Sequence, residues 1–186
     1  HLTILEIGVF FFILKKKYDI LEIRNQEGEI MNKRIKKKRI RLNNKKLVKR
    51  YPFLLAKNIW TNKPSKNYDY SYTLADDILS CWRKAFGKEF FEELRNELIK
   101  CKCLNTFNIF DIKEKHGYLT IYYIINSKDD SDPKYNNIDN IINKYEELSS
   151  TVCYECGKRN QKLKYFTGWD SYLCICDECD KKYENI

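Results

Sequence analysis

Two Cys-x-x-Cys pairs near the end of the chain constrain its fold more than any other feature. Cys153 and Cys156 form the first pair, Cys176 and Cys179 form the second, and nineteen residues separate the pairs. Thiolates at this spacing hold a tetrahedral zinc ion, because each pair can curl around one side of the metal. We therefore predict a structural Zn²⁺ in a small zinc ribbon or knuckle formed by residues 151–186.

Two alternatives accompany this prediction. The cysteines could form disulfides, but such frameworks are typical of secreted chains, and this chain has Lys-rich segments and three further cysteines without obvious partners: Cys81, Cys101 and Cys103. The second alternative concerns the fourth ligand, because Cys174 precedes Cys176 by two residues and could replace Cys179. The two-residue spacer favours Cys176 and Cys179, since it lets both sulfur atoms face one ion.

The net charge of +9 comes from one segment. Residues 51–186 hold 20 basic and 21 acidic side chains, whereas residues 31–50 hold eleven basic and no acidic ones. Like charges at this density repel one another, so the sequence predicts a basic flexible arm. The arm would bind nucleic acid or an acidic partner, or remain a solvated tail. Its basic residues are Lys33, Arg34, Lys36, Lys37, Lys38, Arg39, Arg41, Lys45, Lys46, Lys49 and Arg50.

The first thirty residues begin with His1, and the single methionine of the chain is Met31. We expect translation to start at Met31, which would make residues 1–30 a non-native or upstream segment. The apolar run at residues 7–14 is too short to span a bilayer, and basic residues follow it rather than precede it. We therefore expect no membrane partner.

Residues 51–150 are predicted to form an α+β body. Large apolar residues recur every four positions from about residue 74 to residue 100, which predicts a long amphipathic helix along one face: Trp82, Phe86, Phe90, Leu94 and Leu98. Thr73 and Asp76 are spaced as an acidic capping box before it. Gly87 lies inside the pattern and either splits the helix or marks a close packing point.

Residues 107–125 are rich in β-branched and aromatic side chains, with His116 and Gly117 between two such runs. Both residues tolerate positive φ, so the pattern predicts a β-hairpin with a type I′ turn. Apolar residues at helical spacing then predict a second helix near residues 138–148.

No motif of a known reaction is present. The chain lacks a Gly-rich phosphate loop, a nucleophile motif and a dinucleotide fingerprint, and it has six glycines in all. His116 fits a hairpin turn better than a catalytic base, because no nucleophile or orienting carboxylate accompanies it. Four thiolates would also close the metal site and leave no position at which water could be activated. We therefore predict no catalytic residues and no small-molecule substrate.

Several short strings across residues 51–179 resemble a group of small uncharacterised proteins encoded by bacteriophages and bacterial mobile elements. The strings include Tyr51-Pro-Phe-Leu, Asn58-Ile-Trp-Thr, Trp82-Arg-Lys-Ala-Phe-Gly, Thr167-Gly-Trp and the two cysteine pairs. Two extra residues between Trp169 and the last cysteine pair depart from the pattern and leave Cys174 as a rival ligand. The resemblance implies a mobile-element origin and the cytoplasm of a bacterial host, and it supplies no catalytic residue.

Three functions are compatible with these features. The favoured hypothesis is a non-enzymatic zinc protein that binds nucleic acid or a nucleoprotein through residues 31–50, with inhibition of a host defence nuclease of the CRISPR type as its most specific form. The first alternative is a nucleic-acid-processing, nuclease-like enzyme. The second is a structural interaction module that presents Tyr165, Phe166 and Trp169 to a protein partner.

Overall fold

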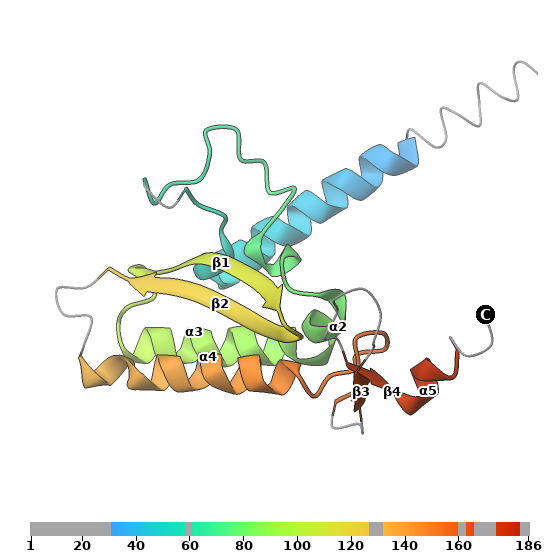
Figure 1. Ribbon diagram of the computed structural model, residues 1–186. Helices are drawn as coiled ribbons and strands as arrows, with labels where there is room; N and C mark the ends of the chain where they lie inside the picture. The colour runs from blue at the N-terminus through green and yellow to red at the C-terminus, as the bar shows by residue number, and fades with distance from the viewer. Residues whose placement is uncertain (1–30, 59–60, 127–131, 160–162, 166–173, 183–186) are drawn as a thin grey trace, which may run out of the picture. The chain divides into compact units, whose positions relative to one another are not determined.

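The computed structural model describes residues 31–58, 61–126, 132–159, 163–165 and 174–182 (Figure 1). The chain divides into two compact units, His1–Asn43 and Asn44–Ile186, and each is described by itself. The second unit contains the predicted α+β body together with the cysteine-rich module. Within the described part of the chain, none of the helices has both the length and the apolar character needed to cross a membrane.

A β-hairpin lies at the centre of the second unit. Strand β1 (Phe107–Lys115) pairs antiparallel with β2 (Tyr118–Ile125), and a register shift near Ile109 marks a β-bulge. His116 and Gly117 form the turn with φ of 53° and 85°. Both values are positive, as a type I′ turn requires, so the predicted hairpin and its turn are confirmed.

Two amphipathic helices, α3 (Lys88–Lys100) and α4 (Asn136–Ser149), lie along the same face of the hairpin (Figure 1). The second predicted helix is thereby confirmed. Side chains of α4 also bond to the edge of β2. The Leu119 amide donates to Ser149 Oγ (2.8 Å), and the Ile121 amide donates to Glu146 Oε1 (2.6 Å). These bonds satisfy backbone donors that would otherwise be left without partners at a sheet edge.

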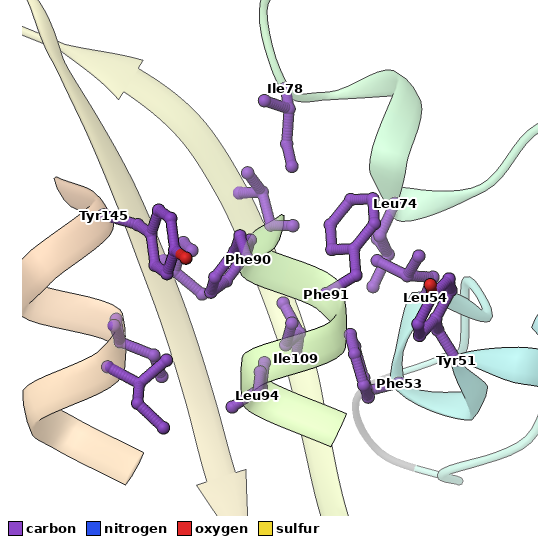
Figure 2. Close-up of a cluster of buried hydrophobic side chains, with 14 of the residues drawn as sticks. Tyr51, Phe53, Leu54, Leu74, Ile78, Phe90, Phe91, Leu94, Ile109 and Tyr145 are labelled. Carbon is purple, nitrogen blue, oxygen red and sulfur yellow. The ribbon is translucent and has the colours of Figure 1, made fainter. Parts of the chain in front are cut away.

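The hydrophobic core lies between these helices and the hairpin. Figure 2 shows Phe90 of α3 facing Tyr145 of α4, and their ring centroids are 4.9 Å apart. On the other side of α3, Phe91 packs against Tyr51 and Phe53. Tyr51 immediately precedes the short helix η1 (Pro52–Leu54), and Phe53 lies within it. The core is therefore continuous from α4 to the start of the body.

The long helix expected from residue 74 to residue 100 is shorter and less regular than predicted. The segment contains a 3-10 turn η2 (Leu74–Asp76), one turn α2 (Ser80–Trp82), a π-helical turn η3 (Arg83–Gly87) and then α3. The predicted capping box is confirmed, but it caps the N-terminus of η2 rather than that of the long helix. The Asp76 carboxylate accepts from the Thr73 amide (2.8 Å). The predicted amphipathic helix therefore begins at Ser80 rather than near residue 74, and it continues through the π turn to Lys100.

The π turn explains why the five predicted core residues of this segment are nevertheless all buried. Residues four apart drift by about 40° per step around an α-helix, or roughly 160° from Trp82 to Leu98. The wider π turn, with its i to i+5 hydrogen bonds, takes up part of that drift. Gly87 ends this turn, so it marks the junction with α3 that the sequence suggested.

Residues 31–50 are helical, whereas their charge density predicted a flexible arm. Lys and Arg are strong helix formers and no Gly or Pro interrupts the segment, which is called the basic helix below. Its C-terminal end is fixed to the body. Leu47 packs against the core, the Arg95 side chain donates to the Arg50 carbonyl (2.9 Å), and Arg50 forms an ion pair with Glu92. The prediction of a flexible arm took only charge repulsion into account, whereas these contacts with the body favour an ordered helix end.

The cysteine-rich module contains three short elements. Strand β3 (Leu163–Tyr165) pairs antiparallel with β4 (Cys174–Cys176), and helix α5 (Asp177–Asp180) follows β4 directly. An isolated antiparallel β-bridge between the backbones of Val152 and Arg159 lies at the base of the loop that carries the first cysteine pair. The fold is thus α+β with a small C-terminal cysteine knuckle, as the sequence predicted.

Candidate metal centre

The side chains of the two Cys-x-x-Cys pairs meet at one point. The sulfur atoms of Cys153, Cys156, Cys176 and Cys179 all lie within 4.8 Å of one another, and this cluster could hold a metal ion. Cys153, Cys176 and Cys179 are each at most 2 % exposed, and Cys156 is partly buried. Four thiol groups this close without a disulfide among them are the arrangement expected of a tetrahedral metal site.

The first pair sits in a tight turn built around a glycine. The Gly157 amide donates to the Cys153 carbonyl (2.9 Å), and the Cys153 amide donates to the Lys158 carbonyl (3.0 Å). Gly157 has a φ of +73°, which is the left-handed region that glycine enters at little cost. The turn directs Cys153 and Cys156 toward the same point.

The second pair is placed by a change from strand to helix. Cys176 ends β4, and Cys179 lies one turn into α5, so the helical turn brings the two sulfur atoms together. The Cys176 amide also donates to Cys153 Sγ (3.4 Å), and the Tyr154 amide donates to the Cys174 carbonyl (2.8 Å). These bonds join the two halves of the site.

Cys174, the alternative ligand, does not belong to the cluster. It opens β4, and its carbonyl accepts from the Tyr154 amide of the first knuckle, as described above. The geometry therefore selects Cys176 and Cys179 from the second half of the module.

The electrostatics of the cluster favour a bound cation. Burial raises the pKa of Cys153, but amide groups of Cys156, Cys176 and Glu155 outweigh it and lower the pKa to about 7. Burial is also the main reason that the pKa of Cys179 rises to about 12. Several thiolates in this buried space would repel one another, and a divalent metal ion would compensate their charge.

The knuckle is attached to the body through α2 and the π turn. The Arg159 guanidinium donates to the Ala85 carbonyl (Nε to O, 2.9 Å) and to Glu89 (2.7 Å). Lys84 Nζ donates to the Cys156 carbonyl (3.2 Å). Gly157 lies so close to α2 that an added Cβ would be 2.9 Å from the Cys81 carbonyl oxygen. Nothing in the local sequence identified these contacts, which join residues about seventy positions apart.

The eleven basic residues of the predicted arm are all exposed on the basic helix. Arg50 and Lys45 make contacts with the body. Arg50 pairs with Glu92, and the Lys45 amine lies 6.0 Å from the centre of the Tyr70 ring. For the predicted partner surface, the structure describes only the backbone of Tyr165, in β3, while Phe166 and Trp169 lie outside the described residues.

The cysteine cluster is the one group of three or more His, Cys, Asp or Glu side chains that the described residues place suitably for a metal ion. No protein-family model matches the chain, and neither does any curated protein or solved structure with which it was compared. The resemblance to phage-encoded proteins therefore stays a prediction.

Proposed function

We propose that this chain is a non-enzymatic binding protein in which a structural zinc ion holds the C-terminal knuckle and the basic helix contacts nucleic acid. The cysteine cluster supports the first part, and the charge and exposure of residues 31–50 support the second. The two parts are tested separately.

The donor set favours zinc. Four thiolates suit zinc or iron, and a closed tetrahedral site formed by two knuckles is typical of structural zinc. Elemental mass spectrometry of the reduced, purified protein should find about one zinc per chain, and Cys156→Ser should lose it. A folded, reduced wild-type protein without zinc, or with iron in its place, would contradict the assignment.

The basic helix carries the nucleic-acid proposal. It presents eleven exposed cations without an acidic residue among them, and such a charged helix attracts phosphate backbones regardless of their sequence. The rest of the chain is close to neutral in net charge, so the excess of positive charge lies in this helix.

The test compares two triple variants of equal charge. The first replaces Lys33, Lys37 and Lys38 of the basic helix by Gln, and the control replaces three exposed lysines of the body in the same way: Lys88, Lys102 and Lys115. Binding of a single-stranded and a duplex oligonucleotide is measured at several salt concentrations. If the helix makes the phosphate contacts, its variant lowers the salt slope by about 2 to 3, and the control leaves it unchanged.

Equal binding by both variants, or no salt dependence in the wild-type protein, would exclude the basic helix as the binding element. Binding to a nucleoprotein but to neither bare oligonucleotide would instead indicate a protein partner.

A further inference from the structure

Residues 56–58 and 61–72, called the pocket loop below, line an open pocket of about 570 Å³. Its lining includes three lysines, Lys57, Lys63 and Lys66, and Asp69 is the one carboxylate among the lining residues described. Hydroxyl and amide groups of Ser, Thr and Asn side chains complete much of the wall. The pocket is therefore rich in hydrogen-bond donors and has an excess of positive charge.

Lys57 gives the pocket a fixed cation. Its side chain is half-buried, and its amine donates to Asn108 Oδ1 at 2.6 Å. Asn108 is itself only 7 % exposed, and its own amide group donates to the Thr106 carbonyl (3.1 Å). A neutral amide thus holds the ammonium group in place without neutralising it.

No carboxylate among the described residues forms an ion pair with Lys57, and burial lowers its pKa. A partly desolvated ammonium group without a counter-charge is unfavourable, and a bound anion would offset that cost.

The loop that forms the pocket is braced from within. The Asn58 amide donates to the Lys63 carbonyl (2.9 Å), and the Asn62 amide donates back to the Asn58 carbonyl (2.8 Å). The Asn58 side chain accepts from the Thr61 amide (3.0 Å). These bonds fix the backbone between Asn58 and Lys63 before any ligand arrives, so less ordering of the backbone is required on binding.

The pocket loop is also tied to the basic helix. Asn44 Nδ2 donates to the Tyr70 carbonyl (2.9 Å), and the Lys45 amine lies over the ring of the same tyrosine. These contacts lie within the second unit and connect the loop to the C-terminal end of the helix. A polyanion bound at that end of the helix would therefore lie close to a second site of positive charge.

We propose that the pocket lined by Lys57, Lys63 and Lys66 binds a phosphate group of the nucleic-acid strand that the basic helix attracts. Lys57 is the fixed cation, and the two exposed lysines contact the outer phosphate oxygens. The inference rests on the proposed function for the source of the phosphate, while anion binding by the pocket does not depend on it.

The experiment uses the full chain with two probes, inorganic phosphate and an oligothymidylate of about fifteen nucleotides. Amide chemical shifts of the pocket loop are followed by NMR during each titration. Both probes should shift these amides, and Lys57→Gln should weaken binding of each by about tenfold, the size expected for one charge-assisted hydrogen bond. Gln retains a donor for Asn108, and unchanged thermal unfolding checks that the fold is kept.

Two further variants separate the possible outcomes. Lys63→Gln with Lys66→Gln changes only exposed side chains and should also weaken phosphate binding, which keeps the test valid if Lys57→Gln does not fold. The triple variant of the basic helix should lose affinity for the oligonucleotide yet still bind inorganic phosphate in the pocket. Phosphate binding by this variant is expected even if the helix proves unnecessary for nucleic-acid binding.

Three results would overturn the proposal. The pocket amides could fail to respond to phosphate, or the Lys57 and Lys63/Lys66 variants could bind phosphate as well as the wild-type protein does. The pocket could also bind inorganic phosphate but leave the oligonucleotide unbound, which would show that its ligand is a small free anion.

Discussion

Replacing Gly157 by Ala should destabilise the protein far more than the same replacement at Gly87. Gly157 has a φ of +73°, and a Cβ there would approach the Cys81 carbonyl oxygen to 2.9 Å. Gly87 is helical, and a Cβ there would be 3.2 Å from Cγ of the Arg83 side chain, which can move. The two sites thus differ both in backbone conformation and in what an added methyl group would meet.

The expected magnitude follows from these two differences. A non-glycine residue in the left-handed region costs about 1–2 kcal/mol, and displacing the backbone of α2 or of the knuckle adds a cost of similar size, so Gly157→Ala should lose about 2–4 kcal/mol. In a chain of this length that loss lowers the melting temperature by roughly 4–16 °C. Gly87→Ala should be neutral or stabilise by up to about 1 kcal/mol, because Ala favours a helix over Gly.

Urea unfolding of the metal-loaded protein measures both variants, and metal content is determined on the same samples. Gly157→Asn separates the two causes, because Asn accepts positive φ more readily but adds the same Cβ. If contact with Cys81 dominates, Asn costs as much as Ala. A Gly157→Ala variant within about 0.5 kcal/mol of Gly87→Ala, less than the strain alone predicts, would refute this account of how the knuckle docks.

Three further predictions concern the metal ligands, a half-buried carboxyl group and the core. Cys179→Ser should abolish stoichiometric metal binding while Cys174→Ser retains it, as measured by elemental mass spectrometry, and the reverse result would make Cys174 the ligand. Burial raises the pKa of Glu146 above its ordinary value of 4.5, so the folded state binds the proton more tightly than the unfolded state does. At a pH above the raised pKa the carboxyl group is charged in both states, and burying this charge lowers the stability of the folded state. Glu146→Gln keeps the acceptor for the Ile121 amide and should therefore stabilise the protein at pH 7 but not below about pH 4, and an equal effect at both pH values in urea unfolding would argue against this. Leu94→Ala, at a fully buried position of α3, should cost about 2–5 kcal/mol in the same assay, and a loss under 1 kcal/mol would show that this part of the core is loosely packed.

Features encoded by neighbouring residues were predictable from the sequence. The hairpin follows from His116 and Gly117 between two β-rich runs, and the cysteine cluster follows from spacing within each pair. The burial of Phe90 and Leu94 follows from helical periodicity. For the hairpin turn, for the helix and within each cysteine pair, the physical cause lies within a few positions of the residue that shows the effect.

Features that depend on distant residues were not predictable in this way. The π turn is joined to the knuckle by Arg159, which bonds to the Ala85 carbonyl across 74 positions. The basic helix was expected to be flexible because only its charge was visible, and its anchor on Arg95 lies 45 positions away. The Lys57 pocket needs Asn108, 51 positions along the chain. Composition and spacing contain no record of such pairings.

The π turn at Arg83–Gly87 has a consequence for how this chain tolerates insertions and deletions. A π turn holds one residue more than the α-helical turn it replaces, so deletion of a single residue there could restore a regular helix. Everything on the N-terminal side would then rotate by roughly 100° relative to α3. Trp82, whose indole nitrogen donates to the Ser149 carbonyl at 2.9 Å, would turn out of the core, and the Cys81 carbonyl would leave the knuckle. The length of this one turn, more than the identity of its side chains, keeps the metal module and the body in register.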